Sequence, residues 1–362
     1  MRRRRSGARG PDPRWLRRAG GGLAAVLCGM LVAGCGSLGT GDDRRRAEEL
    51  AEDLFPGTLK VIDARNLFPE AEGSEITFAF TDDPDAAARL RIDADRDRCD
   101  RGATCADALR GAVGRARADA DRIRTMRKAF EDCGFPVLAV DERRATPWVE
   151  AEVGAETVED VLASVQACAR HWVRARAARN DVGAGSARPL TSVSVSLAAP
   201  ATAARLPSAE ADLPTALRLA HGPRLAALSK KPYYEATYRV TGADGGDVDL
   251  TSPSLRRVLP FEERQAFGRE ASASALPVLR RTYPRAVPVE AVGLGVWRLE
   301  PGRIDRSRGY VLFCERPPAD GRTCLGDHAA VVLADARGHA VSVLRVLDDI
   351  RDDGGVLRLP PL

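Results

Sequence analysis

Cysteine is the residue type whose number and spacing give this sequence its clearest chemistry. The 362-residue chain holds eight cysteines, and two of them, Cys28 and Cys35, lie in an apolar N-terminal stretch. The other six are an even number, which in an exported protein predicts three disulfide bonds. Other pairings are formally open, but two pairs close short local loops and leave the last two cysteines to join neighbouring helices. The predicted bonds are Cys99 with Cys105, Cys133 with Cys168, and Cys314 with Cys324.

Metal binding is the alternative use of these side chains. The sequence has no CxxC pair, and only His328 lies near a pair of cysteines, whereas structural zinc sites combine closely spaced cysteines and histidines. The aspartates of residues 93–97 follow a calcium-loop pattern only until Arg98, which stands where that loop needs glycine. The histidines are scattered, at His171, His221, His328 and His339. We therefore expect no metal site and no cofactor.

Catalytic motifs are the next place to look for chemistry. The sequence contains no GxSxG nucleophile motif, and no phosphate-binding glycine pattern follows a predicted strand. We therefore expect no catalytic residue and a protein that is not an enzyme. A hydrolase whose reactive groups meet only in the folded chain remains an alternative.

One cluster of aromatic and basic residues could form a binding surface. Tyr233, Tyr234 and Tyr238 follow Lys230 and Lys231 on a predicted strand. Such a surface would suit a polyanionic wall polymer or acidic headgroups. Packing between neighbouring strands explains the same tyrosines without any ligand.

The N-terminal segment has the three-part charge pattern of a secretory signal. Residues 1–18 carry eight arginines and one aspartate, and the fourteen residues 19–32 carry no charge. As a helix these fourteen residues would reach about 21 Å, which is short of the roughly 30 Å hydrocarbon core of a bilayer. The pattern therefore favours a signal peptide over a transmembrane helix.

The end of this segment, Val32, Ala33, Gly34 and Cys35, resembles the lipobox of bacterial lipoproteins. The resemblance implies that the Cys35 thiol receives a diacylglyceryl group and that residues 1–34 are removed. Acylation by two or more chains anchors a protein stably, so we expect attachment to the extracytoplasmic face of the cell membrane. An ordinary cleaved signal and an uncleaved anchor are the alternatives, and the export route stays open between the general and twin-arginine pathways.

The signal also accounts for the apparent basic charge of the chain. The formal net charge is +4 for the whole sequence, and removal of residues 1–34 changes it to about −3. A mature chain of this charge has no general attraction for polyanions. We therefore expect no nucleic-acid partner.

The patterning of apolar residues predicts an α+β fold. Helices are expected at residues 43–54, 105–132, 157–179, 214–228 and 262–281. Strands are expected at residues 59–63, 75–81, 88–94, 135–140, 145–153, 191–197, 233–241, 287–299, 310–315, 329–334 and 340–347. We expect antiparallel sheets with helices packed on one face, stapled by the disulfide bonds.

The composition further predicts two domains after the signal. We expect a flexible tether at residues 35–43, an N-terminal α+β domain at 44–199, and a C-terminal α+β domain at 215–362. Residues 200–214, rich in alanine and proline and without periodicity, are the predicted linker.

Anchor, tether, six cysteines and a body poor in motifs together resemble uncharacterised lipoproteins of actinobacteria, in particular streptomycete-type ones. The resemblance implies no activity and no site beyond Cys35. We expect a non-enzymatic binding or scaffolding protein of the cell envelope, with the membrane as one partner and an envelope protein or wall polymer as another. A lipid-anchored solute-binding protein of a transporter is the main alternative, and the oligomeric state stays open.

Overall fold

The computed structural model describes most of the chain after the N-terminal segment. The described residues are 40–67, 72–96, 98–99, 104–141, 145–180, 191–242, 249–251, 253–289, 297–317, 323–352 and 354–362. The expected signal peptide, the lipobox and Cys35 lie outside them. In this described part, no helix combines the length and the apolar character needed to cross a membrane.

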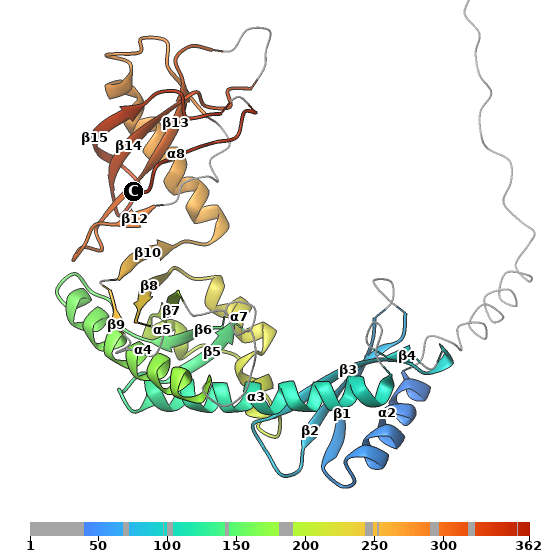
Figure 1. Cartoon of the computed structure of the whole chain (residues 1–362). Coiled ribbons are helices and arrows are strands. Elements are labelled where there is room, and N and C mark those ends of the chain that lie inside the picture. Colours follow the sequence, from blue (N-terminus) through green and yellow to red (C-terminus); the bar gives the residue numbers. More distant parts are fainter. Residues whose placement is uncertain are drawn as a thin grey trace, which may run out of the picture.

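An α+β fold with three successive β-sheets confirms the predicted fold class (Figure 1). The N-terminal sheet has four antiparallel strands in the order β1-β2-β3-β4. They are β1 (Leu59–Asn66), β2 (Ser74–Phe80), β3 (Ala87–Asp93) and β4 (Arg98–Cys99), the last preceded by a 3₁₀ helix (Ala94–Arg96). As their alternation predicts, Ile76, Phe78 and Phe80 all point into one buried face.

Helix α2 (Gly41–Leu54) fixes the start of the folded body to this sheet. One carboxylate oxygen of Asp43 accepts a hydrogen bond from the Ala94 backbone N–H at 2.7 Å, and the other accepts one from the Ser74 hydroxyl at 2.5 Å. The helix begins two residues earlier than predicted. Residues 41–43, expected to belong to the tether, are therefore helical.

Helix α3 (Cys105–Glu131) is shared by two sheets. The Thr104 side chain caps its first turn by accepting a hydrogen bond from the Asp107 N–H. Its first half, including Leu109 and Val113, packs in the core of the N-terminal sheet, and its second half, including Ile123, packs in the core of the next sheet. Twenty-seven residues span about 40 Å, so one rigid helix joins the two sheets, as Figure 1 shows.

The central sheet has six strands, five of them in the order β10-β8-β7-β6-β5. They are β5 (Val137–Asp141), β6 (Thr146–Glu150), β7 (Ser192–Ala198), β8 (Tyr233–Thr241) and β10 (Ser254–Val258), and β9 (Asp249–Leu250) pairs with β8. Strands β6 and β7 run parallel. A parallel pair needs a crossover connection, which α4 (Val158–Asn180) supplies.

Helices cover both faces of the central sheet, although the sequence predicted one covered face. Helices α3 and α4 lie on one face together with α6 (Thr215–Leu219), whose Ala216 and Leu219 join the same core. On the other face, Leu228 of α7 (Gly222–Ser229) packs with Trp148 and Ala198.

The predicted linker at residues 200–214 joins two strands of this one sheet and does not join two different sheets. Strand β7 precedes it and β8 follows it, and the two strands are antiparallel neighbours. Its first residues form the short helix α5 (Pro200–Ala203). Just after it, the backbone N–H groups of Thr215 and Ala216 donate hydrogen bonds to the carbonyl oxygens of Pro84 and Asp85. The change from one sheet to the next falls instead after β10, near residue 259.

The C-terminal sheet has five antiparallel strands, four of them in the order β11-β13-β14-β15. They are β11 (Val287–Pro288), β13 (Arg306–Cys314), β14 (His328–Asp335) and β15 (Ala340–Leu347), and β12 (Arg298–Leu299) pairs with β13. Helix α8 (Phe261–Leu279) covers one face, where Ala271 and Ala275 meet Phe313 and Val332. Six consecutive residues of β14 are buried, and this strand lies inside the sheet, between β13 and β15.

The three predicted disulfide bonds are confirmed. The Cα atoms are 4.9 Å apart in the pair Cys99 with Cys105 and 6.0 Å apart in the two others, Cys133 with Cys168 and Cys314 with Cys324. These separations lie in the usual range for a bridge. The second bond ties the end of α3 to the middle of α4.

Candidate functional site

The three tyrosines of the proposed binding surface, Tyr233, Tyr234 and Tyr238, do not share an exposed face. Tyr238 is fully buried, and its hydroxyl donates a hydrogen bond to the Leu162 carbonyl oxygen. Tyr234 is half-buried in the same core, whereas Tyr233 packs on the opposite face against Trp148, with 4.3 Å between ring centroids. Because alternate residues of a strand point to opposite faces and both faces carry helices, the packing interpretation is the correct one.

The histidines lie apart, and two of them pair with carboxylates. His328 Nδ1 is 2.8 Å from Asp348 Oδ1, and His339 Nδ1 is 3.0 Å from Glu270 Oε1. Among the described residues, no group of three or more His, Cys, Asp or Glu side chains could hold a metal ion.

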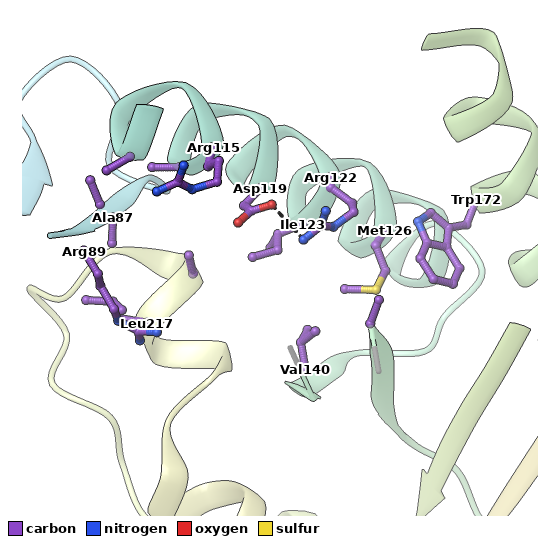
Figure 2. A pocket seen from close by; sticks show the side chains of 15 residues that line it. Ala87, Arg89, Arg115, Asp119, Arg122, Ile123, Met126, Val140, Trp172 and Leu217 are labelled. Atoms are coloured by element: carbon purple, nitrogen blue, oxygen red, sulfur yellow. Dashed lines mark ion pairs between the residues drawn. The ribbon is translucent and has the colours of Figure 1, made fainter. Parts of the chain in front are cut away.

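A cavity of about 250 Å³ lies beside the middle of α3, where this helix passes from the N-terminal sheet to the central sheet (Figure 2). We call it the central pocket. One face of α3 forms its long wall, and β3, β5, α4 and α6, together with Ala145 just before β6, contribute the remainder. The side chains that the following argument uses are Arg89, Arg115, Asp119, Arg122, Met126 and Trp172.

The wall that α3 provides follows from helical spacing. Arg115, Asp119, Arg122 and Met126 recur every three or four residues, so they stand above one another on one side of the helix. Their chemistry changes along that side from charged to apolar. From Arg115 to Met126 the rise is about 16 Å, which gives the central pocket two distinct ends.

Figure 2 shows these two ends directly. Arg89 and Arg115 stand at one end, and Met126, Val140 and Trp172 stand at the other. Between them, Arg122 and Asp119 form an ion pair with 2.8 Å between Nη2 and Oδ1. The central pocket is therefore cationic at one end and apolar at the other.

Positive charge also extends behind the pocket. Arg176 follows Trp172 by one turn of α4 and is about half-buried. Burial, together with the neighbouring charge of Arg122, holds the pKa of Arg176 below its usual value. The charge of Arg176 thus lies close enough to that of Arg122 for the two to disfavour each other.

Trp172 closes the apolar end. Its side chain is 3% exposed and its ring lies 6.2 Å from the ring of Phe130, centroid to centroid. The indole N–H is buried and has no hydrogen-bond partner among the described residues. Buried donors are normally paired, so this N–H is available to an acceptor placed in the pocket.

Two further hollows are lined by other parts of the described chain. One, of about 590 Å³, lies between α4, β10 and β12, and the other, of about 630 Å³, lies between α8 and the turn that joins β14 to β15. The second contains the pair of His339 with Glu270. This second hollow is more open to solvent than the central pocket, which makes it a weaker candidate for holding a small ligand, since ligand sites bury most of the ligand's surface.

The sequence did not predict the central pocket. Its wall on α3 has the pattern of an ordinary solvated helix face, and its other residues come from four distant segments. No protein-family model, curated protein or solved structure shows a significant match to the chain. Proposals about function therefore rest on the N-terminal pattern and on this geometry.

Proposed function

We propose that this chain is a lipid-anchored lipoprotein of the extracytoplasmic face of the cell membrane, and that it binds a small molecule in the central pocket. Support for the anchor comes from the arginine-rich start, the uncharged residues 19–32 and the lipobox-like Val32, Ala33, Gly34 and Cys35. The general likeness to uncharacterised actinobacterial lipoproteins points the same way.

The start of the folded body suits a short tether. Helix α2 begins at Gly41, six residues after Cys35. An extended chain covers at most about 3.5 Å per residue, so the anchor and α2 are separated by roughly 20 Å at most. The tether proposal thus brings the N-terminal sheet close to the membrane surface.

The observation that carries the binding role is the central pocket. The pocket is concave, and helices and strands form most of its walls. It combines an apolar end with a few charged groups. Small-molecule sites have these properties. The lining arginines keep their charge in proteins, and Asp119, the one carboxylate among the described lining residues, is paired with Arg122, so this lining supports binding in preference to acid–base catalysis. The protein is accordingly proposed not to be an enzyme.

The anchor is tested by labelling living cells with a fatty-acid analogue. Wild-type protein should take up the label, and Cys35→Ala should lose it and leave the membrane or remain unprocessed. Cys28→Ala is the matched control, because Cys28 lies in the same apolar stretch but outside the lipobox. Label retained by Cys35→Ala would contradict the lipid anchor.

The binding role is tested on the purified mature lipoprotein in phosphatidylcholine vesicles. A panel of small molecules of every charge is added, and the melting temperature is measured. A ligand that binds only the folded state at about 100 times its Kd stabilises it by about 2.7 kcal/mol, which is an easily measured shift. If no member of the panel raises the melting temperature, the binding proposal is wrong.

A further inference from the structure

The described residues that line the central pocket differ in burial according to their chemistry. Eight of them are buried, and all eight are apolar. The four charged ones are exposed or half-buried, and they are Arg89, Arg115, Asp119 and Arg122. Asp119 and Arg122 also pair with each other. The charged side chains therefore form the rim of the pocket, in contact with water, and its buried part is apolar.

Four of the buried residues are alanines, and their small side chains leave the space. Ala112 and Ala116 lie one turn apart on α3, Ala88 lies on β3, and Ala216 lies on α6. A methyl group reaches only a short way from each backbone, so a gap is left between the three elements.

Hydrogen bonds outside the pocket hold α3 and α6 in these positions. Arg124 of α3 is 2.8 Å from Asp83 and 3.1 Å from Asp85, in the loop between β2 and β3. The same loop accepts hydrogen bonds from the backbone N–H groups of Thr215 and Ala216, at the start of α6. The space between the alanines is therefore preformed, and a ligand does not have to open it.

The other four buried residues are larger, and they are Ile123, Met126, Val140 and Trp172. We call these four and the four alanines the apolar floor. Apart from the Trp172 N–H, their side chains carry no hydrogen-bonding N or O atom, whereas an ordered water needs two to four polar partners. Water is therefore held poorly on the apolar floor, and its replacement by the apolar surface of a ligand is favourable. The flexible side chain of Met126 can adapt to the shape of that ligand.

We infer that the central pocket binds a small uncharged molecule whose apolar ring or chain lies on the apolar floor. The inference rests on the proposed binding function and names its ligand class. A charged group on the apolar floor would lose its hydration without gaining a partner, which is costly. The cavity of about 250 Å³ exceeds the roughly 150 Å³ that is enough for an apolar cavity to bind benzene. The ligand therefore has the size of one ring with a short substituent, or of a short chain.

The test uses probes that differ in one property at a time. Butanol, pentanol and hexanol lengthen an uncharged chain by one methylene at each step, and hexanoate and hexylamine give that chain a negative or a positive charge. Binding to the mature lipoprotein in phosphatidylcholine vesicles is measured by the melting temperature and by tryptophan fluorescence. Each added methylene should raise the affinity about fourfold. Hexanoate and hexylamine should bind at least about tenfold more weakly than hexanol, since their charged groups have to stay in water.

Variants that fill the space between the alanines locate the ligand. Ala116→Leu should weaken hexanol binding by about tenfold or more, because the larger side chain occupies the place of the ligand. Ala112→Leu, one turn earlier, is a second filling variant, so the test does not depend on the folding of one protein. Ala118→Leu is the matched control: it makes the same change at an exposed residue of α3 that does not line the pocket. It should keep binding within about twofold, and it also corrects for alcohol dissolved in the vesicles.

A variant of the rim tests whether charge takes part. Arg115→Gln should leave hexanol binding within about twofold, since an uncharged ligand on the apolar floor makes no use of that guanidinium group.

The remaining outcomes separate the ligand class from the binding function. Unchanged hexanol binding in the folded filling variants would place the ligand elsewhere and overturn the inference. Binding of hexanoate or hexylamine as tightly as hexanol, or loss of hexanol binding in Arg115→Gln, overturns the uncharged ligand and leaves the binding function standing. The same follows if no alcohol binds but another small molecule raises the melting temperature. Failure of every small molecule to bind overturns both proposals.

Discussion

The hydroxyl group of Tyr238 donates a hydrogen bond to the backbone carbonyl oxygen of Leu162 at 3.0 Å, and so fastens strand β8 to helix α4 inside the largest core. Burial raises the pKa of Tyr238 well above its usual value, so the donor stays protonated over the working pH range. The residue therefore acts in folding and not in ligand binding.

Tyr238→Phe should destabilise the protein by about 1 kcal/mol, since one net buried hydrogen bond is lost while the Leu162 carbonyl oxygen stays within a helix. Urea unfolding measures the loss. Tyr234→Phe is the matched control, because the Tyr234 hydroxyl has no hydrogen-bond partner among the described residues and should cost less than about 0.5 kcal/mol. Equal losses in the two variants would show that the Tyr238 hydrogen bond contributes nothing of its own.

The disulfide bonds should differ in their contribution to stability. The bond of Cys133 with Cys168 closes a loop of 35 residues and that of Cys99 with Cys105 closes one of 6. In the chain-entropy treatment these loops correspond to about 4 and about 2 kcal/mol. Replacing both cysteines of a pair by alanine should therefore cost more for the first pair, and Cys168 also loses buried packing.

The ranking is measured by urea unfolding of the two double-alanine variants. Thiol counting under denaturing conditions should find no free thiol among these six cysteines in the wild-type chain. A larger loss for the short loop would contradict the assigned order, and two or more free thiols would contradict the bonds.

Local pattern was enough to predict most helices and strands. The alternation in residues 233–241 and 340–347 predicted β8 and β15 with the bounds that the structure has. Strand order within a sheet was out of reach, because alternation tells which face of a strand is buried and not which strand lies beside it. Strand β10 (Ser254–Val258) was missed because it holds only two apolar residues.

The place of residues 200–214 in the fold and the existence of the central pocket could not be predicted, and the reason is the same for both. Composition marks residues 200–214 as irregular, but it does not show that Thr215 and Ala216 bond to the loop at Pro84 and Asp85. In the same way, Arg115 and Trp172 belong to one pocket only because α3 packs against α4. Both features depend on contacts between segments far apart in the chain.

Asp85 should make stability depend on pH in acid. Burial opposes ionisation of this carboxyl, but hydrogen bonds from Thr215 and Arg124 outweigh burial and lower its pKa. Because its pKa is lower in the folded than in the unfolded chain, where it is about 3.9, the unfolded chain binds more protons. This contribution is complete above about pH 4 to 5 and is lost as the pH falls through the folded-state pKa.

Arg124→Gln should flatten this dependence, since Arg124 lies 3.1 Å from Asp85 and 2.8 Å from Asp83. The free energy of unfolding in urea is measured from pH 6 down to pH 3 for both proteins. Arg44→Gln, which breaks an exposed pair with Glu48 on α2, is the control and should leave the slope unchanged. A slope in Arg124→Gln equal to that of the wild type would refute the role of this ion pair.

Replacing glycine by alanine should change the stability of the protein in opposite directions at Gly309 and at Gly114. At Gly309 in β13, an added Cβ would lie 2.4 Å from the ring of Trp297, which also packs edge-on against Phe267 at 5.0 Å between centroids. The ring has to move, so Gly309→Ala should destabilise the protein by about 1 to 3 kcal/mol. At Gly114, on an exposed turn of α3, an added Cβ meets nothing within 4 Å, and Gly114→Ala should stabilise by about 0.5 to 1 kcal/mol through helix propensity.

Comparing these two variants separates the effect of side-chain packing on stability from the effect of backbone conformation. Urea unfolding gives the two free energies, and tryptophan emission reports on Trp297, which should shift in Gly309→Ala and stay unchanged in Gly114→Ala. A neutral Gly309→Ala with unchanged emission would contradict the close approach of Trp297 to β13. Trp297 directly precedes β12, and its ring packs against Phe267 of α8. A loss of stability confined to Gly309→Ala would therefore show that Trp297 links β12 to α8.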